Sequence, residues 1–302
     1  MTDRHNPVGQ ERMRERVQLP GLPSAGPLYR RALLGALPLG GGRRGDALPD
    51  VEYAVDGVTV DTGHLAEYDR VCGFRLTDEL PGTYPHVLGF PLALRLMTGA
   101  DFPLPLVGLV HVANRITVHR PVDAGEPLDL VAYAELLRPH ERGRQVDVVV
   151  TASVGGVEVW RGVSTYLRRE STPGGGGGRE RRDREAPPAP SARWRVTPSV
   201  GTEYARISGD LNPIHTSRLG ARLFGFPRPI AHGMWTKARC LAALAGRLPA
   251  AYTVGVEFKR PVLLPSTVDF TATSAEGFAL HSARTGHPHL TGALRQCRSS
   301  SE

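Results

Sequence analysis

The chain has 302 residues, of which 40% are hydrophobic and 22% charged, so it has enough apolar material for two folded domains and is not a disulfide-stapled miniprotein. Its net charge of +7 comes from residues 1–45 and 168–185, which carry net charges of +5 and +2, and the remainder of the chain is balanced. Binding of nucleic acid or a membrane surface needs basic side chains gathered on a folded face. We therefore expect no nucleic-acid partner.

Cysteine usage and the N-terminal sequence bear on the compartment. Cys72, Cys240 and Cys297 are too few and too scattered for a disulfide framework or a cysteine-rich metal site, so a reducing, cytoplasmic location is expected. Residues 1–27 contain no apolar segment of the secretory type. The longest apolar stretch, residues 32–42, has 11 residues, which is well short of the roughly 20 that cross a bilayer. No membrane span is expected.

The first part of the chain predicts a tail followed by one folded unit. Residues 1–27 are polar and interrupted by prolines, which favours a disordered or extended tail. A folded unit is expected over residues 28–170, with an amphipathic helix at 29–37 that packs on this unit and a longer helix at 89–97. Apolar, β-branched runs then predict strands at 109–118, 128–136, 145–153 and 157–167.

A linker divides the chain. Residues 171–192, STPGGGGGRERRDREAPPAPSA, combine a glycine run, mixed charges and a proline cluster, and have almost nothing to bury. The second unit, residues 193–302, repeats the same order of elements. Helices are expected at 200–207, 217–224 and 231–246, and strands at 252–258, 267–273, 278–283 and 290–294.

Two short matches between the halves indicate duplication. The sequence EYDRVCGF at 67–74 aligns with EYARISGD at 203–210, and VHRPV at 118–122 aligns with FKRPV at 258–262. The matches occur in the same order, with Glu67 to Arg120 spanning 53 positions and Glu203 to Arg260 spanning 57. A helix followed by an antiparallel meander in each half predicts an α+β fold.

The segment SGDLNPIH, residues 208–215, is the main candidate for chemistry. Glycine, asparagine and proline favour a tight loop, which can turn Asp210 and His215 towards one point. A carboxylate and an imidazole that share a water molecule can remove one proton and supply another. In the alternative interpretation, Asp210 only caps a turn or the next helix and His215 is an ordinary histidine.

A second segment, PRPIAHGM at 227–234, runs into the long helix of the second half. Backbone N–H groups at a helix start are unpaired and carry the positive end of the helix dipole, so Gly233 could donate to a developing oxyanion. The alternative is that Gly233 serves only close packing at the helix start.

Together these residues resemble the signature of MaoC-like (R)-specific enoyl-thioester hydratases. The matching positions are Tyr204, Ser208, Gly209, Asp210, Asn212, Pro213, Ile214 and His215, followed by Ile230, Ala231, His232, Gly233 and Met234. The resemblance implies a hot-dog fold, a long helix wrapped by an antiparallel sheet. It also implies that Asp210 and His215 are the catalytic dyad, that Gly233 supplies the oxyanion N–H, and that Asn212 and Ser208 position the loop, water or substrate.

The whole chain resembles the double hot-dog members of that family, in which the N-terminal repeat has lost the chemistry. Phe74 stands where the second half has Asp210, Cys72 replaces Ser208, and no Asn-Pro-x-His sequence follows Gly73. The first repeat is therefore expected to keep the fold, to form a pseudo-dimer with the second and to shape the acyl pocket. Pairing of two chains as a homodimer stays open.

The resulting expectation is a hydro-lyase that interconverts 2-enoyl and (3R)-hydroxyacyl thioesters of coenzyme A or acyl carrier protein, without a metal or other cofactor. His287 and His289 have no acidic or cysteine partner nearby in the sequence, which argues against a metal site there. Two alternatives remain: a dehydratase restricted to carrier-bound acyl groups, and a non-catalytic thioester-binding subunit.

Overall fold

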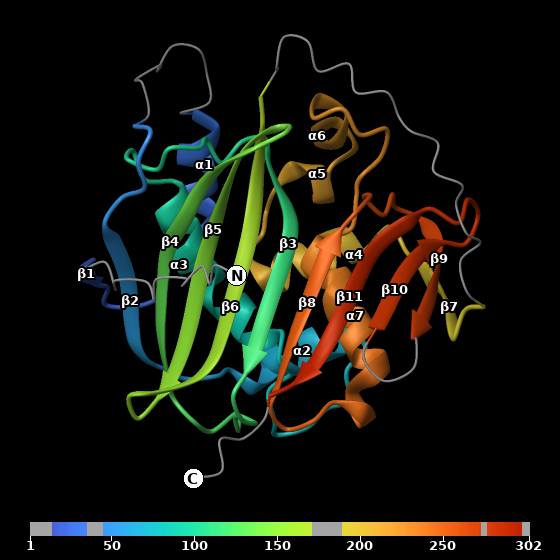
Figure 1. Ribbon diagram of the computed structural model, residues 1–302, viewed down its shortest axis with the longest axis horizontal. Helices are drawn as coiled ribbons and strands as arrows, with labels where there is room; N and C mark the ends of the chain where they lie inside the picture. The colour runs from blue at the N-terminus through green and yellow to red at the C-terminus, as the bar shows by residue number, and fades with distance from the viewer. Residues whose placement is uncertain (1–13, 35–44, 171–188, 273–276, 298–302) are drawn as a thin grey trace, which may run out of the picture.

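The computed structural model describes residues 14–34, 45–170, 189–272 and 277–297 (Figure 1). Residues 1–13 of the expected tail and most of the expected linker, residues 171–188, lie outside the described residues. Where the chain divides into its two units therefore stays a prediction.

One sheet of eleven strands runs across the molecule in the order β1-β2-β4-β5-β6-β3-β8-β11-β10-β9-β7 (Figure 1). All neighbouring strands are antiparallel except β1 and β2. The strands are β1 (Glu15–Gln18), β2 (Val51–Val58), β3 (Leu109–Val118), β4 (Leu128–His140), β5 (Gly143–Val154), β6 (Val157–Arg169), β7 (Ala192–Val196), β8 (Tyr252–Phe258), β9 (Ser266–Ala272), β10 (Gly277–Ser282) and β11 (Pro288–Gln296).

The strand order reveals the duplication. Strands β2-β4-β5-β6-β3 form one half of the sheet, and β7-β9-β10-β11-β8 repeat the same connectivity in the other half, so that β3 and β8 meet in the middle. There Ile116 pairs with Val254, and the hydroxyls of Thr117 and Thr253 are 3.0 Å apart. The expected α+β fold of two similar repeats joined as a pseudo-dimer is confirmed. We call these halves the first and the second repeat.

Helices lie on one face of the sheet (Figure 1). They are α1 (Ala25–Leu34), α2 (Thr62–Cys72), α3 (Tyr84–Met97), α4 (Val200–Ser208), α5 (Pro213–Thr216), α6 (Arg218–Leu223) and α7 (Gly233–Leu244), followed by the 3₁₀ turn η2 (Ala245–Arg247). The long helix α3 packs against β4 and β5, and α7 packs against β10. None of the described helices is long and apolar enough to cross a bilayer.

Helix starts differ from the sequence-based prediction for local reasons. Helix α3 starts five residues before the expected Gly89, with Pro85 in its first turn, where a missing N–H costs nothing. Helix α7 starts two residues after the expected Ala231, because the N–H of Ala231 donates to the carbonyl of Val262 and His232 has extended backbone angles. Gly233 is therefore the first residue of α7.

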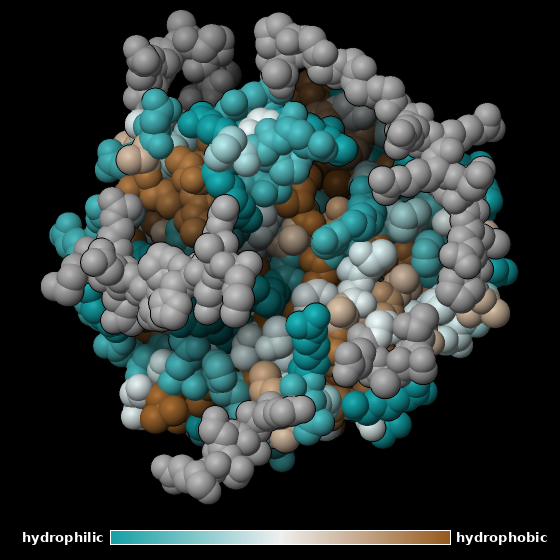
Figure 2. Space-filling model, in the orientation of Figure 1, coloured by the Kyte–Doolittle hydropathy of each residue, from teal (hydrophilic) through white to brown (hydrophobic). Residues whose placement is uncertain are grey.

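The opposite face of the sheet is open to solvent at β8, whereas residues 146–152 of β5 are buried on both faces. Hydrophilic and hydrophobic side chains are mixed on this face (Figure 2), and burial along β8 alternates. Tyr252, Val254 and Val256 point to the helices and are buried, whereas Glu257 is exposed. Alternation with a period of two is the consequence of the pleat, and a sheet covered on one face only shows it clearly.

The two repeats also meet through their short helices. Arg70 and Glu67 of α2 form ion pairs with Glu203 and Arg206 of α4, at 3.6 and 2.9 Å respectively. Glu67 and Arg70 are equivalent to Glu203 and Arg206 in the duplicated segments. The two ion pairs are therefore related to each other by the pseudo-twofold axis. Buried residues of both repeats belong to one continuous hydrophobic core.

Folded structure begins earlier than predicted. Residues Glu15–Gln18 form β1, which pairs in parallel with β2, and α1 starts at Ala25 rather than near residue 28. The strand escaped prediction because Glu15–Gln18 contains a single apolar residue, Val17, and so shows no alternation. Helix α1 packs against α3, as expected for a helix on the first repeat.

Lys237 of α7 is completely buried beneath the junction of the repeats. Its ammonium donates to the carbonyl oxygens of Asn114 in β3 and Val254 in β8, at 3.3 and 3.1 Å, and to the side-chain oxygen of Asn114 at 2.5 Å. Burial lowers the pKa of Lys237 well below its usual value. The lysine thus ties the central helix of the second repeat to strands of both repeats.

The chain's two lysines permit a matched test of this contact. Lys237→Met should lower the free energy of unfolding by about 2–4 kcal/mol, because two buried carbonyl groups lose their donor. Lys259 is exposed and pairs with Glu257. Lys259→Met should lower the free energy of unfolding by less than about 1 kcal/mol. Urea titrations of both variants measure the difference. Equal small losses would show that the buried contact does not stabilise the junction.

Candidate active site

The loop after α4 places the candidate residues. Helix α4 ends at Ser208, and Gly209 takes a left-handed conformation with φ 71°, which glycine adopts without steric cost. The hydroxyl of Ser208 donates to the carbonyl of Tyr204 at 2.8 Å and accepts from the N–H of Asp210 at 3.2 Å. Ser208 therefore fixes the backbone from which the Asp210 side chain emerges.

Asn212 fixes the other end of the loop. Its side-chain oxygen accepts from the N–H of Ile214 and caps α5, while its own N–H donates to Oδ1 of Asp210, both at 3.3 Å. Pro213 starts α5, so His215 follows within the first turn. The observed hydrogen bonds of Ser208 and Asn212 are made within the loop, and a contact of either with water or substrate stays a prediction.

Asp210 and His215 converge as the sequence predicts. Oδ2 of Asp210 lies 4.0 Å from Nε2 of His215, and their side chains are 27% and 9% exposed. Nδ1 of His215 is 2.8 Å from the carbonyl oxygen of Ile230, which can only accept, so Nδ1 carries the hydrogen and Nε2 of the neutral ring has a free lone pair. A single water can donate a hydrogen bond of about 2.8 Å to each atom. With an angle of roughly 90° at the water oxygen, these two bonds span the gap.

Electrostatics favour the protonation states that this geometry needs. Burial alone would raise the pKa of Asp210. Its interactions with His232 and His215 and the hydrogen bonds from Tyr29 and Asn212 outweigh this effect, so the pKa of Asp210 lies below the ordinary 3.8. Burial lowers the pKa of His215 below 6.5 against the opposing effect of Asp210. Near neutral pH the site therefore holds a carboxylate beside a neutral imidazole.

His232 is part of this site, although the sequence analysis did not select it. Its ring stacks on His215 with centroids 3.6 Å apart, and its Nε2 donates to the backbone carbonyl of Asp210 at 3.0 Å. Burial lowers its pKa to about 3, so the ring is neutral. Because His232 directly precedes α7, this bond ties the loop of residues 208–215 to the start of that helix. Its position next to Gly233 in the motif was the sequence signal that could have identified His232 as a site residue.

The same three side chains are of types that can bind a metal ion. Ligand atoms of Asp210, His215 and His232 lie within 4.8 Å of one another. The two imidazoles, however, are stacked with an interplanar angle of 24°, so their lone pairs run nearly side by side and do not converge on one ion. Nε2 of His232 also carries a hydrogen directed at a carbonyl oxygen. This donor set does not suit the tetrahedral coordination that zinc requires.

Gly233 begins α7 next to His232, where its N–H has no acceptor within the helix. A Cβ added there would lie 3.1 Å from the ring of Phe258, at the end of β8. The absence of a side chain therefore leaves room between the helix start and this ring. The N–H lies at the positive end of the helix dipole, close to the loop that carries Asp210.

Comparisons with known proteins show the family to which the chain belongs. Residues 182–287 match the sequence model of the family described as "MaoC like domain". The chain is 39% identical over 269 residues to "3-hydroxyacyl-thioester dehydratase X" of Mycobacterium tuberculosis. The aligned region covers 88% of this chain and 95% of the relative. The chain belongs to the MaoC-like dehydratase family.

Further relatives place the chain within this family. "3-hydroxyacyl-thioester dehydratase Y" of M. tuberculosis is 31% identical over 232 residues, which cover 72% of this chain and 77% of the relative. The crystal structure of the X enzyme from M. tuberculosis superposes with a TM-score of 0.73 at 37% identity, covering 82% of this chain and 100% of that chain. A MaoC-like dehydratase from Phytophthora capsici shares the fold, with a TM-score of 0.65 at 20% identity, over 83% of this chain and 96% of its own.

The first repeat of this MaoC-like protein has an apolar version of the loop. Gly73 ends α2 in the left-handed conformation, as Gly209 ends α4, but Phe74 then stacks on Tyr68 with ring centroids 6.1 Å apart. Cys72 is fully buried, and burial raises the pKa of its thiol. The first repeat thus keeps the backbone turn and carries no carboxylate at this position.

Other elements outside the second repeat do reach the loop of residues 208–215. The hydroxyl of Tyr29 in α1 donates to Oδ1 of Asp210 at 2.5 Å. His86 of α3 and His111 of β3 lie near enough to Asp210 to interact with its charge. Burial lowers the pKa of these histidines to about 4 and about 3, so both are neutral. None of these residues belongs to a local motif, and the sequence analysis missed all three.

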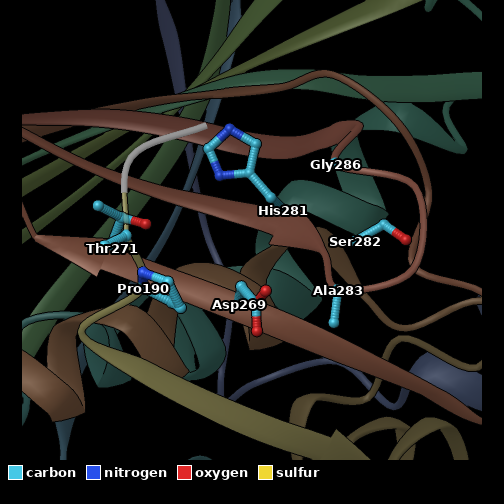
Figure 3. Close-up of a pocket in the computed structure, with 8 residues that line it drawn as sticks. Pro190, Asp269, Thr271, His281, Ser282, Ala283 and Gly286 are labelled. Carbon is cyan, nitrogen blue, oxygen red and sulfur yellow. The ribbon is translucent and has the colours of Figure 1, made fainter. Parts of the chain in front are cut away.

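A small pocket lies away from this MaoC-like site, at the edge of the sheet (Figure 3). Asp269 of β9 and His281 of β10 face it, but Arg193 of β7 already holds the Asp269 carboxylate with bonds of 2.6 and 2.9 Å. The pocket is lined by Ala189, Pro190, Asp269, Thr271, His281, Ser282, Ala283 and Gly286. None of these residues belongs to the loop of residues 208–215.

Proposed function

We propose that the protein is a hydro-lyase that adds water to 2-enoyl thioesters, giving (3R)-hydroxyacyl thioesters, or removes it in the reverse direction, in fatty-acid or related acyl metabolism. The observation that carries this proposal is the 4.0 Å separation of two proton acceptors, Oδ2 of Asp210 and Nε2 of His215. A water that donates to both presents its oxygen lone pair to a third atom. In a bound enoyl thioester, that atom is C3.

The chemistry follows from how charge moves. When the water oxygen bonds to C3, one water proton passes to the dyad and the other stays on the new hydroxyl group. C2 receives one proton from the dyad, so the dyad ends in its starting protonation state and the elements of one water are added. Dehydration is the same sequence reversed. A positioned acid–base pair of this kind contributes typically ~10²–10⁴-fold to a rate.

Negative charge builds on the thioester oxygen between these two steps. The N–H of Gly233, at the start of α7, is the group proposed to stabilise it, because its hydrogen is free and the helix dipole favours an anion there. His232 helps indirectly, since its bond to the Asp210 carbonyl fixes the loop relative to that helix start. This bond fixes the position of the Gly233 N–H relative to Asp210, which activates the water.

The proposed substrate is a coenzyme A or acyl-carrier-protein thioester, handled in the cytoplasm, where the unpaired Cys72, Cys240 and Cys297 suit a reducing environment. The test is to incubate the full chain with 2-enoyl-CoA substrates of increasing length and to follow loss of the conjugated-thioester absorbance. Turnover of at least one length is expected. The same acyl group on a carrier protein then shows which thioester has the higher kcat/KM. A folded protein inert towards both substrate types would reject the hydro-lyase and favour a binding subunit.

The pH profile tests the proposed charge state. Activity requires His215 neutral and Asp210 ionised, and the pKa of each is lowered. As pH falls, kcat/KM should therefore stay high below pH 6.5, the ordinary imidazole value, and decline only in more acidic solution. Initial rates at constant ionic strength give this acid limb. A midpoint above 6.5 would contradict a neutral, buried imidazole in the free enzyme.

A further inference from the structure

Helix α1 lies outside both the region matched by the family model, residues 182–287, and the paired strands of the two repeats. It packs behind the sheet on α3 of the first repeat, yet it also touches the catalytic loop of the second (Figure 1). Two contacts show this. A Cβ on Gly209 would lie 3.5 Å from that of Ala25, and the Tyr29 hydroxyl reaches Asp210.

The Tyr29 contact is polar and partly buried. The hydroxyl donates to Oδ1 of Asp210 at 2.5 Å, and Oδ1 also accepts from the N–H of Asn212. Burial raises the pKa of Tyr29 above its usual value, with the Asp210 charge adding to the effect, so the phenol stays protonated and can only donate to a carboxylate. A hydrogen bond from a neutral donor to a charged acceptor is stronger than one between neutral groups.

The two oxygens of Asp210 therefore have different environments. Oδ1 is engaged by α1 and by its own loop, whereas Oδ2 faces His215 at 4.0 Å and His232 at 3.9 Å. Rotation of the carboxyl group out of this orientation would break the Tyr29 bond. With Oδ1 fixed, Oδ2 is directed at the gap in which the proposed reaction holds its water.

We propose that Tyr29 is a positioning residue, which aims Oδ2 of Asp210 at the reacting water and keeps the carboxyl group ionised, so that the N-terminal helix α1 is a working part of the active site. This rests on the proposed function for its kinetic consequence, while the contact itself is tested independently of activity. In the proposed reaction Tyr29 does not exchange a proton with the substrate. It acts through Asp210.

The direct test is the ionisation of Asp210. Groups that face or approach it are Tyr29 of α1, His215 of α5, His232 before α7, Tyr204 of α4, Tyr166 of β6, His86 of α3 and His111 of β3. In Tyr29→Phe only the donor is lost, so the Asp210 carboxyl should titrate about one to two pH units higher, as seen by carbon-13 NMR with Asp210→Asn assigning the signal. An unchanged titration would overturn the proposal, whether or not the protein proves to be a hydro-lyase.

The kinetic test separates positioning from a structural role. Tyr29→Phe should lower kcat about 10-fold with KM changed less than about 2-fold, and in an Asp210→Asn background it should have almost no further effect. Tyr133→Phe is the matched control. Tyr133 lies in β4, and its hydroxyl accepts a hydrogen bond from Arg161 of β6 at 2.9 Å, so the variant should keep wild-type kinetics. Additive losses, or a faster Tyr29→Phe enzyme, would overturn the positioning role. A wild type without any turnover would instead reject the proposed function.

Discussion

Asp210→Asn and His215→Gln should each lower kcat for enoyl-thioester hydration by about 10²–10⁴-fold, because each removes one of the two acceptors that hold and deprotonate the water. Asn keeps the shape of Asp but offers an amide nitrogen in place of a carboxylate oxygen. Gln cannot act as a base. Asp210 lies on the loop and His215 in α5, and both segments are held by bonds from Ser208 and Asn212, so the fold should persist.

The pair acts as a unit, and this gives a second expectation. The double variant should be little slower than the more damaged single variant, since removing either acceptor already disables the shared water. Two exposed residues serve as controls: Asp78→Asn and His119→Gln should match the wild type. Single variants that retained full activity would show that the convergence of Asp210 and His215 is a loop contact without a catalytic role.

Gly201→Ala should have the second-largest effect, although Gly201 is not near the reacting atoms. It lies in the first turn of α4, and a Cβ there would come within 2.1 Å of the carbonyl oxygen of His215. Backbone cannot swing aside as a side chain can, so α4 and α5 must separate and His215 must move. A displacement of about 1 Å at a catalytic group can cost about 10²-fold in rate, and overpacking of this kind costs about 1–3 kcal/mol of stability.

Kinetics and denaturation of the same preparation check both parts of this expectation. Gly246→Ala is the matched control, because a Cβ at Gly246 would meet nothing within 4 Å and the residue also lies in a helical turn. It should leave kcat/KM unchanged. If Gly201→Ala kept wild-type kcat/KM, the position of His215 would be less restricted than the contact with α4 implies.

Sequence reasoning succeeded where a feature is local and periodic. The strand at 109–118 was predicted with its observed bounds, because a pleated strand that buries one face imposes its pattern directly on the chain. The convergence of Asp210 and His215 was predicted because only a short Asn-Pro loop separates them. The order of elements in each half reflected the duplication, which the mirrored strand order confirms.

It failed where a contact spans the fold. Tyr29 and Asp210 are 181 residues apart, and no pattern within either segment encodes their pairing. His232 stood beside Gly233 in a recognised motif, but its partner is a backbone carbonyl, which has no residue-type signature. Strand β1 has too little apolar character to be distinguished from a polar tail. The Tyr29 contact forms because α1 packs on α3 of the first repeat and reaches the loop of the second.

The most direct test of the proposed chemistry is to analyse the product formed from a 2-enoyl-CoA by the full chain in oxygen-18 water. The expected product is a 3-hydroxyacyl-CoA that carries the label in its C3 hydroxyl group, because the attacking oxygen comes from the water shared by Asp210 and His215. The resemblance to (R)-specific hydratases predicts that this product has the R configuration. A 3S product, or hydrolysis of the thioester with the label in a free carboxylate, would contradict the proposed chemistry.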